Sequence, residues 1–214
     1  MYCGNSFGKI DFVCPRCELL LRRKMLDGGY SIPFLQGYKG HSLFVWNQET
    51  DIWVRPLVYG LKGGDPKNAY NKLAEMLTYE LLKTYSLDDL YVFIPAPASS
   101  GLSYDHASVL SHCLADLWKG EVFQPFKKSE STQLQKRLSK SQRRKKSVEI
   151  VDPKFFKYLK LLEKESYNIV FVDDVYTTGS TCRAVLKNFY PLSKLHSWTI
   201  FYKAMLKKKN HLKP

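Results

Sequence analysis

The chain has 214 residues and is 44% hydrophobic, which is enough apolar material for one packed domain with a small appendage. A chain that is disordered throughout is therefore excluded. No run of about 18 uninterrupted apolar residues occurs, and the first residues lack the apolar stretch and small-residue cleavage site of a secretory signal. We expect a cytoplasmic protein that does not insert into a membrane.

The formal net charge of +13 is concentrated in two segments. Residues 127–147 contain nine basic side chains and one acidic one, and residues 203–214 contain five basic side chains and no acidic one. The rest of the chain is balanced in charge. Such a local excess favours a polyanionic partner, whether nucleic acid, an anionic membrane surface or a phosphorylated small molecule.

The first 26 residues are expected to form a small zinc-knuckle-like segment that precedes a main domain over residues 27–214. Cys14 and Cys17 have the spacing with which two thiolates chelate one Zn²⁺, and Cys3 fits a second knuckle. A structural Zn²⁺ site needs four ligands. A fourth cysteine at knuckle spacing would lie three positions before Cys3, which is one residue before Met1. If the fourth ligand comes from the chain itself, His41 is the nearest histidine in the sequence. Free thiols on an unstructured leader are the alternative.

Strand-like and helix-like segments alternate along the first half of the main domain. Residues 42–46 and 52–59 are expected to be strands on either side of a polar turn. Leucines at helical spacing predict an amphipathic helix over residues 66–85. The short apolar run over residues 90–94 is stopped by Pro95 and predicts a buried strand that enters a loop.

The second half of the chain continues this alternation. A 3.6-residue period of apolar side chains predicts a helix over residues 106–118, and the β-branched run over residues 169–172 predicts an interior strand. A helix over residues 181–190 and a strand over residues 198–202 follow. Alternating strands and helices of these lengths predict an α/β fold with a largely parallel sheet flanked by helices.

The most informative segment is residues 172–181, where the interior strand leads into two aspartates and a hydroxyl-rich turn that opens a helix. Ligands of open α/β sheets bind at the carboxyl ends of strands, and a helix N-terminus offers backbone N–H groups to a phosphate. The alternative is a strand edge followed by ordinary helix-capping residues. The aspartates are Asp173 and Asp174, and the turn consists of Thr177, Thr178, Gly179, Ser180 and Thr181.

Asp173 and Asp174 are neighbours on an extended backbone, so their side chains are expected to point to opposite sides of the strand. One carboxylate would then be available to ribose hydroxyls, directly or through Mg²⁺, while the other organises the loop. The absence of a Cβ at Gly179 lets the backbone approach phosphate oxygens closely. The segment is therefore suited to a phosphorylated pentose.

Residues 171–181 resemble the phosphoribosyl pyrophosphate motif of type I phosphoribosyltransferases. The wider pattern resembles the ComF family of competence-associated, phosphoribosyltransferase-like proteins, and the order of the motifs agrees over nearly the whole chain. Those motifs are the cysteine knuckle at Cys3, Cys14 and Cys17, the glycine-containing run 61–65, the strand end 94–97, the basic stretch 132–143 and the acidic segment 173–181.

The resemblance implies a type I phosphoribosyltransferase-like fold and an enzyme that binds phosphoribosyl pyrophosphate with Mg²⁺. Asp173 and Asp174 would be its catalytic carboxylates, and the turn over residues 177–181 would hold the 5-phosphate. The pyrophosphate would be held by Lys62 and by the backbone of Ala96, Pro97, Ala98 and Ser99. The alternative for Lys62 is a solvated loop lysine with no role in binding.

The chain departs from the family pattern in the loop that follows these residues. Where the family has an Arg-Gly-Phe-Asn-Gln-like run, residues 101–107 contain no arginine. A guanidinium is a bidentate partner for an anion, so this chain lacks one such partner at that position.

The basic segment over residues 127–147 has three interpretations. Type I phosphoribosyltransferases carry at this position a mobile loop that closes over the substrate and shields it from water. The segment could instead contact single-stranded DNA by neutralising backbone phosphates, or it could be a solvated run of charge. The side chains concerned include Lys136, Arg137, Arg143, Arg144, Lys145 and Lys146.

The resemblance favours a role in DNA uptake during natural transformation. In one interpretation the chain is a phosphoribosyltransferase-like protein that binds phosphoribosyl pyrophosphate and turns it over. In a second it is a single-stranded DNA-binding accessory factor without turnover that works beside a competence helicase. Purine or pyrimidine salvage is a third interpretation, for which the sequence contains no base-specificity signature.

Overall fold

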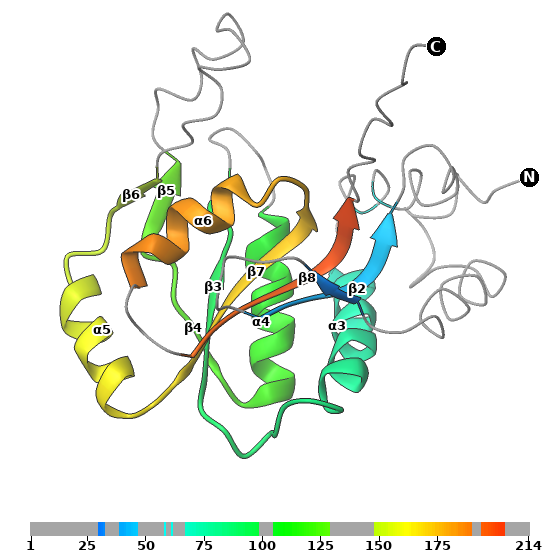
Figure 1. Ribbon diagram of the computed structural model, residues 1–214, viewed down its shortest axis with the longest axis horizontal. Coiled ribbons are helices and arrows are strands. Elements are labelled where there is room, and N and C mark those ends of the chain that lie inside the picture. Colours follow the sequence, from blue (N-terminus) through cyan, green and yellow to red (C-terminus); the bar gives the residue numbers. More distant parts are fainter. Residues whose placement is uncertain are drawn as a thin grey trace, which may run out of the picture.

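The structure of the chain is a computed structural model that describes residues 30–32, 39–46, 58, 61, 67–98, 105–128, 148–189 and 194–203. These residues form a central sheet with helices on both faces (Figure 1). No helix in the described ranges is both long enough and apolar enough to cross a membrane.

The central sheet has six strands in the order β1-β2-β8-β7-β3-β4. All neighbouring strands are parallel except β1, which pairs with β2 in the antiparallel direction. The expected α/β fold with a largely parallel sheet flanked by helices is confirmed. The strands span Tyr30–Ile32 (β1), Lys39–Trp46 (β2), Tyr91–Pro95 (β3), Glu121–Val122 (β4), Asn168–Tyr176 (β7) and Leu195–Lys203 (β8).

Helices cover both faces of the sheet because the interior strands bury alternate side chains on opposite sides. On β7, Val170 and Val172 join the core that contains α3 and α4, whereas Ile169 and Phe171 join the core that contains α5 and α6. The helices span Lys67–Leu81 (α3), His106–Trp118 (α4), Phe155–Lys164 (α5) and Ser180–Leu186 (α6), and a 3₁₀ turn at Lys187–Phe189 (η4) follows α6.

A second, two-stranded antiparallel sheet lies beside the α5 and α6 layer. It pairs β5 (Phe126–Lys128) with β6 (Val148–Ile150). The ring of Phe126 packs edge-on against Phe155 of α5 and Phe189 of η4. This aromatic packing holds β5 against α5 and η4.

Four of the five helices and strands expected before residue 119 are present in the structure. Helix α4 has the expected bounds, β2 contains the expected strand, and α3 lies within the expected helix. Strand β3 is shifted by one residue from the expected 90–94 and includes Pro95. The strand expected over residues 52–59 lies outside the described residues except for Val58, which is helical. The cysteine segment over residues 1–26 also lies outside them.

Two expectations in the second half are corrected. The strand predicted over residues 169–172 continues through both aspartates to Tyr176, because β8 stays paired with it as far as Tyr176 and Tyr202. The helix predicted over residues 181–190 begins at Ser180 and is α-helical only to Leu186. Strand β8 contains the predicted segment 198–202, and helix α5 was not predicted.

Candidate functional site

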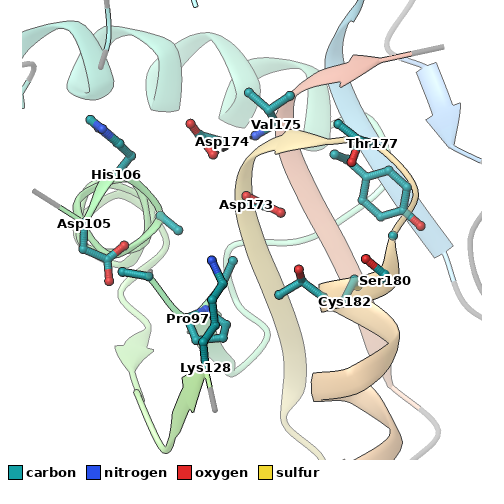
Figure 2. A pocket seen from close by; sticks show the side chains of 16 residues that line it. Pro97, Asp105, His106, Lys128, Asp173, Asp174, Val175, Thr177, Ser180 and Cys182 are labelled. Atoms are coloured by element: carbon teal, nitrogen blue, oxygen red, sulfur yellow. Dashed lines mark hydrogen bonds between the residues drawn. The ribbon is translucent and has the colours of Figure 1, made fainter. Parts of the chain in front are cut away.

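A cavity of about 450 Å³ lies at the carboxyl ends of β3 and β7 (Figure 2). The starts of α4 and α6 and the end of β5 complete its walls. Sheet edges of this kind are where open α/β folds bind ligands. The described residues that line the cavity are Ala96, Pro97, Ala98, Asp105, His106, Ala107, Lys128, Asp173, Asp174, Val175, Tyr176, Thr177, Gly179, Ser180, Thr181 and Cys182.

The cavity opens where β3 stops pairing with β7. The ladder between these strands ends at Pro95 and Val172, and Ala96 N donates a last hydrogen bond to the Val172 carbonyl at 2.8 Å. Pro97 has no N–H with which to continue the ladder. Strand β7 nevertheless runs on beside β8 to Tyr176. Its last residues therefore have a neighbouring strand on one side only, and the other side faces the cavity.

Asp173 and Asp174 lie on this one-sided end of β7, and both line the cavity. Asp174 Oδ1 also accepts a hydrogen bond from Val175 N at 2.9 Å. Burial raises the pKa of Asp173 well above its usual range, and the adjacent charge of Asp174 raises it further, while the ammonium of Lys128 opposes the shift. The pair is therefore electrostatically costly in the absence of a cation.

The hydroxyl-rich turn directly follows β7 and lines the same cavity as the acidic pair. Gly179 precedes the first residue of α6 with a left-handed backbone (φ 67°), and a Cβ at this position would lie 2.1 Å from Tyr176 Oη. Only glycine fits both constraints. Thr178 Oγ1 donates to Ser180 Oγ at 3.2 Å, which orders the turn. Thr177, Gly179, Ser180 and Thr181 line the cavity, whereas Thr178 is not among the lining residues.

The opposite wall comes from the start of α4. Asp105 caps this helix, since its Oδ1 accepts a hydrogen bond from Ser108 N at 3.1 Å. Figure 2 shows Asp105 and His106 across the cavity from Asp173 and Asp174. Neither residue was predicted to belong to the site. The capping role of an aspartate just before a predicted helix is the signal that could have placed it there.

Lys128, the last residue of β5, reaches the cavity from the small second sheet. It is half-buried, and Figure 2 shows its side chain extending toward β7. Lys127 precedes it on the same strand and is exposed. Lys128 is the only lysine or arginine among the described lining residues. The basic run over residues 127–147 indicated this charge, but the sequence did not single out Lys128.

Cys182 closes the floor of the cavity beneath Asp173. Its side chain is 1% exposed, and burial raises the pKa of its thiol well above the usual range. A thiol in such a position is a packed group and not a nucleophile. Cys113 on α4 is buried as well, so both cysteines in the described ranges are core residues.

The remaining expected site residues lie outside the described residues. This applies to Lys62 and Ser99 for pyrophosphate, and to the basic side chains between residues 136 and 146. It also applies to Cys3, Cys14 and Cys17. In the ranges that the structure describes, no group of three or more His, Cys, Asp or Glu side chains is able to hold a metal ion. His41, named above as the nearest histidine to a Zn²⁺ site, bonds Tyr85 Oη through Nε2 at 2.9 Å.

No protein-family model matches this chain, and a comparison with curated protein sequences finds no match. The class of protein that the fold and the cavity define is an α/β protein with an acidic, hydroxyl-rich pocket at the carboxyl edge of its sheet.

Proposed function

We propose that this protein has a type I phosphoribosyltransferase-like fold and binds phosphoribosyl pyrophosphate together with Mg²⁺ in the carboxyl-edge cavity. One observation supports the proposal above all. The acidic pair at the end of β7 and the hydroxyl-rich turn before α6 line the same cavity. A phosphorylated pentose needs both features close together, because its ribose hydroxyls donate and its phosphate oxygens accept.

The turn supplies the phosphate half of the proposed site. Backbone N–H groups at the start of α6 and the hydroxyls of Thr177, Ser180 and Thr181 are donors for the 5-phosphate. Gly179 keeps the backbone free of a Cβ at the point of closest approach. Thr178 contributes indirectly, because its hydroxyl bonds Ser180 and holds the turn.

The acidic pair supplies the ribose half. Carboxylates of Asp173 and Asp174 accept hydrogen bonds from the 2- and 3-hydroxyls. They also fit Mg²⁺, which prefers oxygen donors and is commonly bound by one or two carboxylates with substrate oxygens and water. The substrate and water would provide the remaining oxygens. Bound Mg²⁺ would neutralise charge on the pyrophosphate.

The reaction proposed for this site is transfer of the phosphoribosyl group to an acceptor. The bond between C1 of the ribose and the pyrophosphate oxygen breaks, and its electron pair leaves with pyrophosphate. A lone pair of the acceptor forms the new bond to C1. The chain contributes positioning and charge stabilisation and no covalent intermediate. The loop at Ala96, Pro97 and Ala98 faces the leaving group, and Lys62 and Ser99 are assigned to the same subsite.

We place this activity in DNA uptake during natural transformation on the ComF resemblance alone. The same resemblance suggests a competence helicase as a partner, and the basic segment between β5 and β6 suggests single-stranded DNA. Structural Zn²⁺ at Cys3, Cys14 and Cys17 remains part of the proposal for the N-terminal segment.

Calorimetric titration with phosphoribosyl pyrophosphate and Mg²⁺ tests the proposed function. The wild type should bind, and the Asp173→Asn/Asp174→Asn double variant should lose about 100-fold or more in affinity, because two charge-assisted contacts disappear. Asp88→Asn is the matched control, since Asp88 is an exposed aspartate before β3 at the other edge of the sheet. Failure of the wild type to bind would exclude the function.

A further inference from the structure

Lys128 is a cationic side chain that lines the cavity together with the loop Ala96–Ala98 and with Asp173. Lys128 ends β5 and pairs with Val148 of β6, so its backbone is fixed by a ladder. The aromatic packing of Phe126 against α5 and η4 holds that ladder against the main domain. The side chain lines the cavity with the loop Ala96–Ala98 on one side and Asp173 on the other. It is therefore a built feature of the site.

The described cavity lining contains more acidic than basic side chains, so the charge of Lys128 opposes a net negative charge. The described lining residues include three carboxylates, at Asp105, Asp173 and Asp174, and one ammonium, at Lys128. Lys128 lines the same cavity as Asp173 and Asp174, so its ammonium and their carboxylates attract each other. Without ligand, the lysine is thus a counter-charge for the acidic pair.

The loop that faces the leaving group lacks a cation of its own. Ala96, Pro97 and Ala98 carry no charged side chain, and Pro97 carries no backbone N–H. A pyrophosphate placed there would face the three carboxylates of the described lining. Bound Mg²⁺ would offset part of that repulsion, and a cationic side chain that reaches the loop would add attraction. Lys128 is the one lysine or arginine among the described lining residues.

We propose that Lys128 is a pyrophosphate-binding cation of this cavity, in addition to Lys62, and that its ammonium passes from the acidic pair to the pyrophosphate when the ligand and Mg²⁺ bind. The inference rests on the proposed function. It adds a residue, a ligand group and an exchange of partners. Asp173 and Asp174 would hold the Mg²⁺, whose charge would replace that of Lys128 beside them, so that the ammonium would be available to the phosphate oxygens.

Titration of three ligands against four proteins tests the proposal. The ligands are inorganic pyrophosphate with Mg²⁺, ribose 5-phosphate, and phosphoribosyl pyrophosphate with Mg²⁺. The proteins are the wild type, Lys128→Met, Lys128→Arg and Lys127→Met. Lys127→Met removes the same charge one residue away, from an exposed position on the same strand.

Lys128→Met should weaken pyrophosphate binding about 10- to 100-fold, as expected for loss of a charge-assisted hydrogen bond. Its affinity for ribose 5-phosphate should stay within about twofold of the wild type, because the turn and the acidic pair are intact. Lys128→Arg should keep most of the pyrophosphate affinity, and Lys127→Met should keep all of it. Thermal unfolding of each variant checks that it is folded.

The outcomes separate this inference from the function on which it rests. A wild type that binds neither ribose 5-phosphate nor phosphoribosyl pyrophosphate removes both. If the wild type binds ribose 5-phosphate but Lys128→Met and Lys127→Met have equal pyrophosphate affinities, only the role of Lys128 is wrong. A lysine that merely neutralises Asp173 would lower the free energy of unfolding on substitution and leave pyrophosphate binding unchanged.

Discussion

The polar side chains at the two edges of the central sheet differ in their surroundings: those at one edge bond one another, and those at the other line a cavity. At the amino ends of the strands, His41 of β2 and His196 of β8 contact Tyr85, which follows α3, and Asn168 of β7 contacts His196. Tyr85 Oη lies 2.9 Å from His41 Nε2 and 3.2 Å from His196 Nδ1, and His196 Nε2 lies 3.2 Å from Asn168 Oδ1. At the carboxyl ends, Asp173 and Asp174 face a cavity.

The donor and acceptor roles of the hydrogen bonds at the amino edge follow one from another, starting from Asn168. Asn168 Nδ2 donates to the Leu90 carbonyl, so Oδ1 accepts from His196 Nε2. In the neutral imidazole, His196 Nδ1 is then an acceptor for the Tyr85 hydroxyl. His41 Nε2 in turn donates to Tyr85 Oη. Each group has a partner within the protein, and burial lowers the pKa of His196 to about 4, which keeps that imidazole neutral.

The carboxyl edge has the reverse character. Burial and the neighbouring charge raise the pKa of Asp173, so the folded protein holds a carboxylate in unfavourable surroundings. A satisfied hydrogen-bond network stabilises a fold, whereas a carboxylate with a strongly raised pKa at a cavity is a candidate for ligand binding. The comparison therefore predicts a structural role for one edge and ligand binding at the other, and three substitutions test it.

The largest effect on stability is expected from His196→Leu at the amino edge. The substitution leaves Asn168 Oδ1 without its donor and the Tyr85 O–H without its acceptor, which should lower the free energy of unfolding by about 3 kcal/mol at pH 7. Urea denaturation measures it. His112→Leu is the control, because His112 is exposed on α4. Ligand affinity should not change, and a loss of binding would show that the two edges are not independent.

The loss of stability caused by His196→Leu should also depend on pH, in a direction set by the pKa of His196. The folded pKa of His196 is lowered from 6.5 to about 4, so the unfolded chain binds the proton more readily. Its contribution to stability is complete above pH 6.5 and is lost as the pH falls toward 4. The destabilisation caused by His196→Leu should therefore shrink on acidification through that window. A constant difference between pH 7 and pH 4.5 would contradict the neutral imidazole.

An intermediate effect is expected from Gly179→Ala at the carboxyl edge. The left-handed backbone and the approach of Tyr176 Oη to the Cβ position should together cost about 2 kcal/mol in the free energy of unfolding. Phosphate binding should weaken as the turn shifts. The opposite exchange at the other edge, Lys119→Gly, relieves a left-handed residue (φ 51°) at the end of α4 and should be neutral or slightly stabilising. Equal effects of the two substitutions would argue against a built turn.

The smallest effect on stability, and the one with the opposite sign, is expected from Asp173→Asn. Removing the unfavourable carboxylate should raise the free energy of unfolding on the order of 1 kcal/mol at pH 7. Because the folded pKa is raised, the folded protein binds this proton more tightly, and Asp173 favours folding more as the pH falls toward 3.8. The gain from Asp173→Asn should therefore shrink between pH 7 and pH 4.5. A variant less stable than the wild type at pH 7 would show that the carboxylate is satisfied within the protein.

Much of the fold was predictable because local pattern determines it. Helix α4 has the bounds that its 3.6-residue period predicted, and β3 ends one residue later than predicted, at Pro95, just before Pro97 stops the ladder. Helix α5 was missed although its lysines and apolar residues follow the amphipathic pattern of a helix, with Phe155 and Leu162 on its buried face. The extension of β7 past the aspartates was missed because pairing with β8 keeps those residues extended.

The sequence by itself determined the acidic pair, the hydroxyl-rich turn and their order after an interior strand, because these features are contiguous and obey local rules of strand, turn and helix. Only the tertiary structure decided that Asp105 and Lys128 share a cavity with them. Those residues come from α4 and β5, and their approach depends on strand order, on the early end of β3 beside β7, and on the packing of Phe126. Such long-range contacts follow from how the layers assemble, which no local pattern specifies.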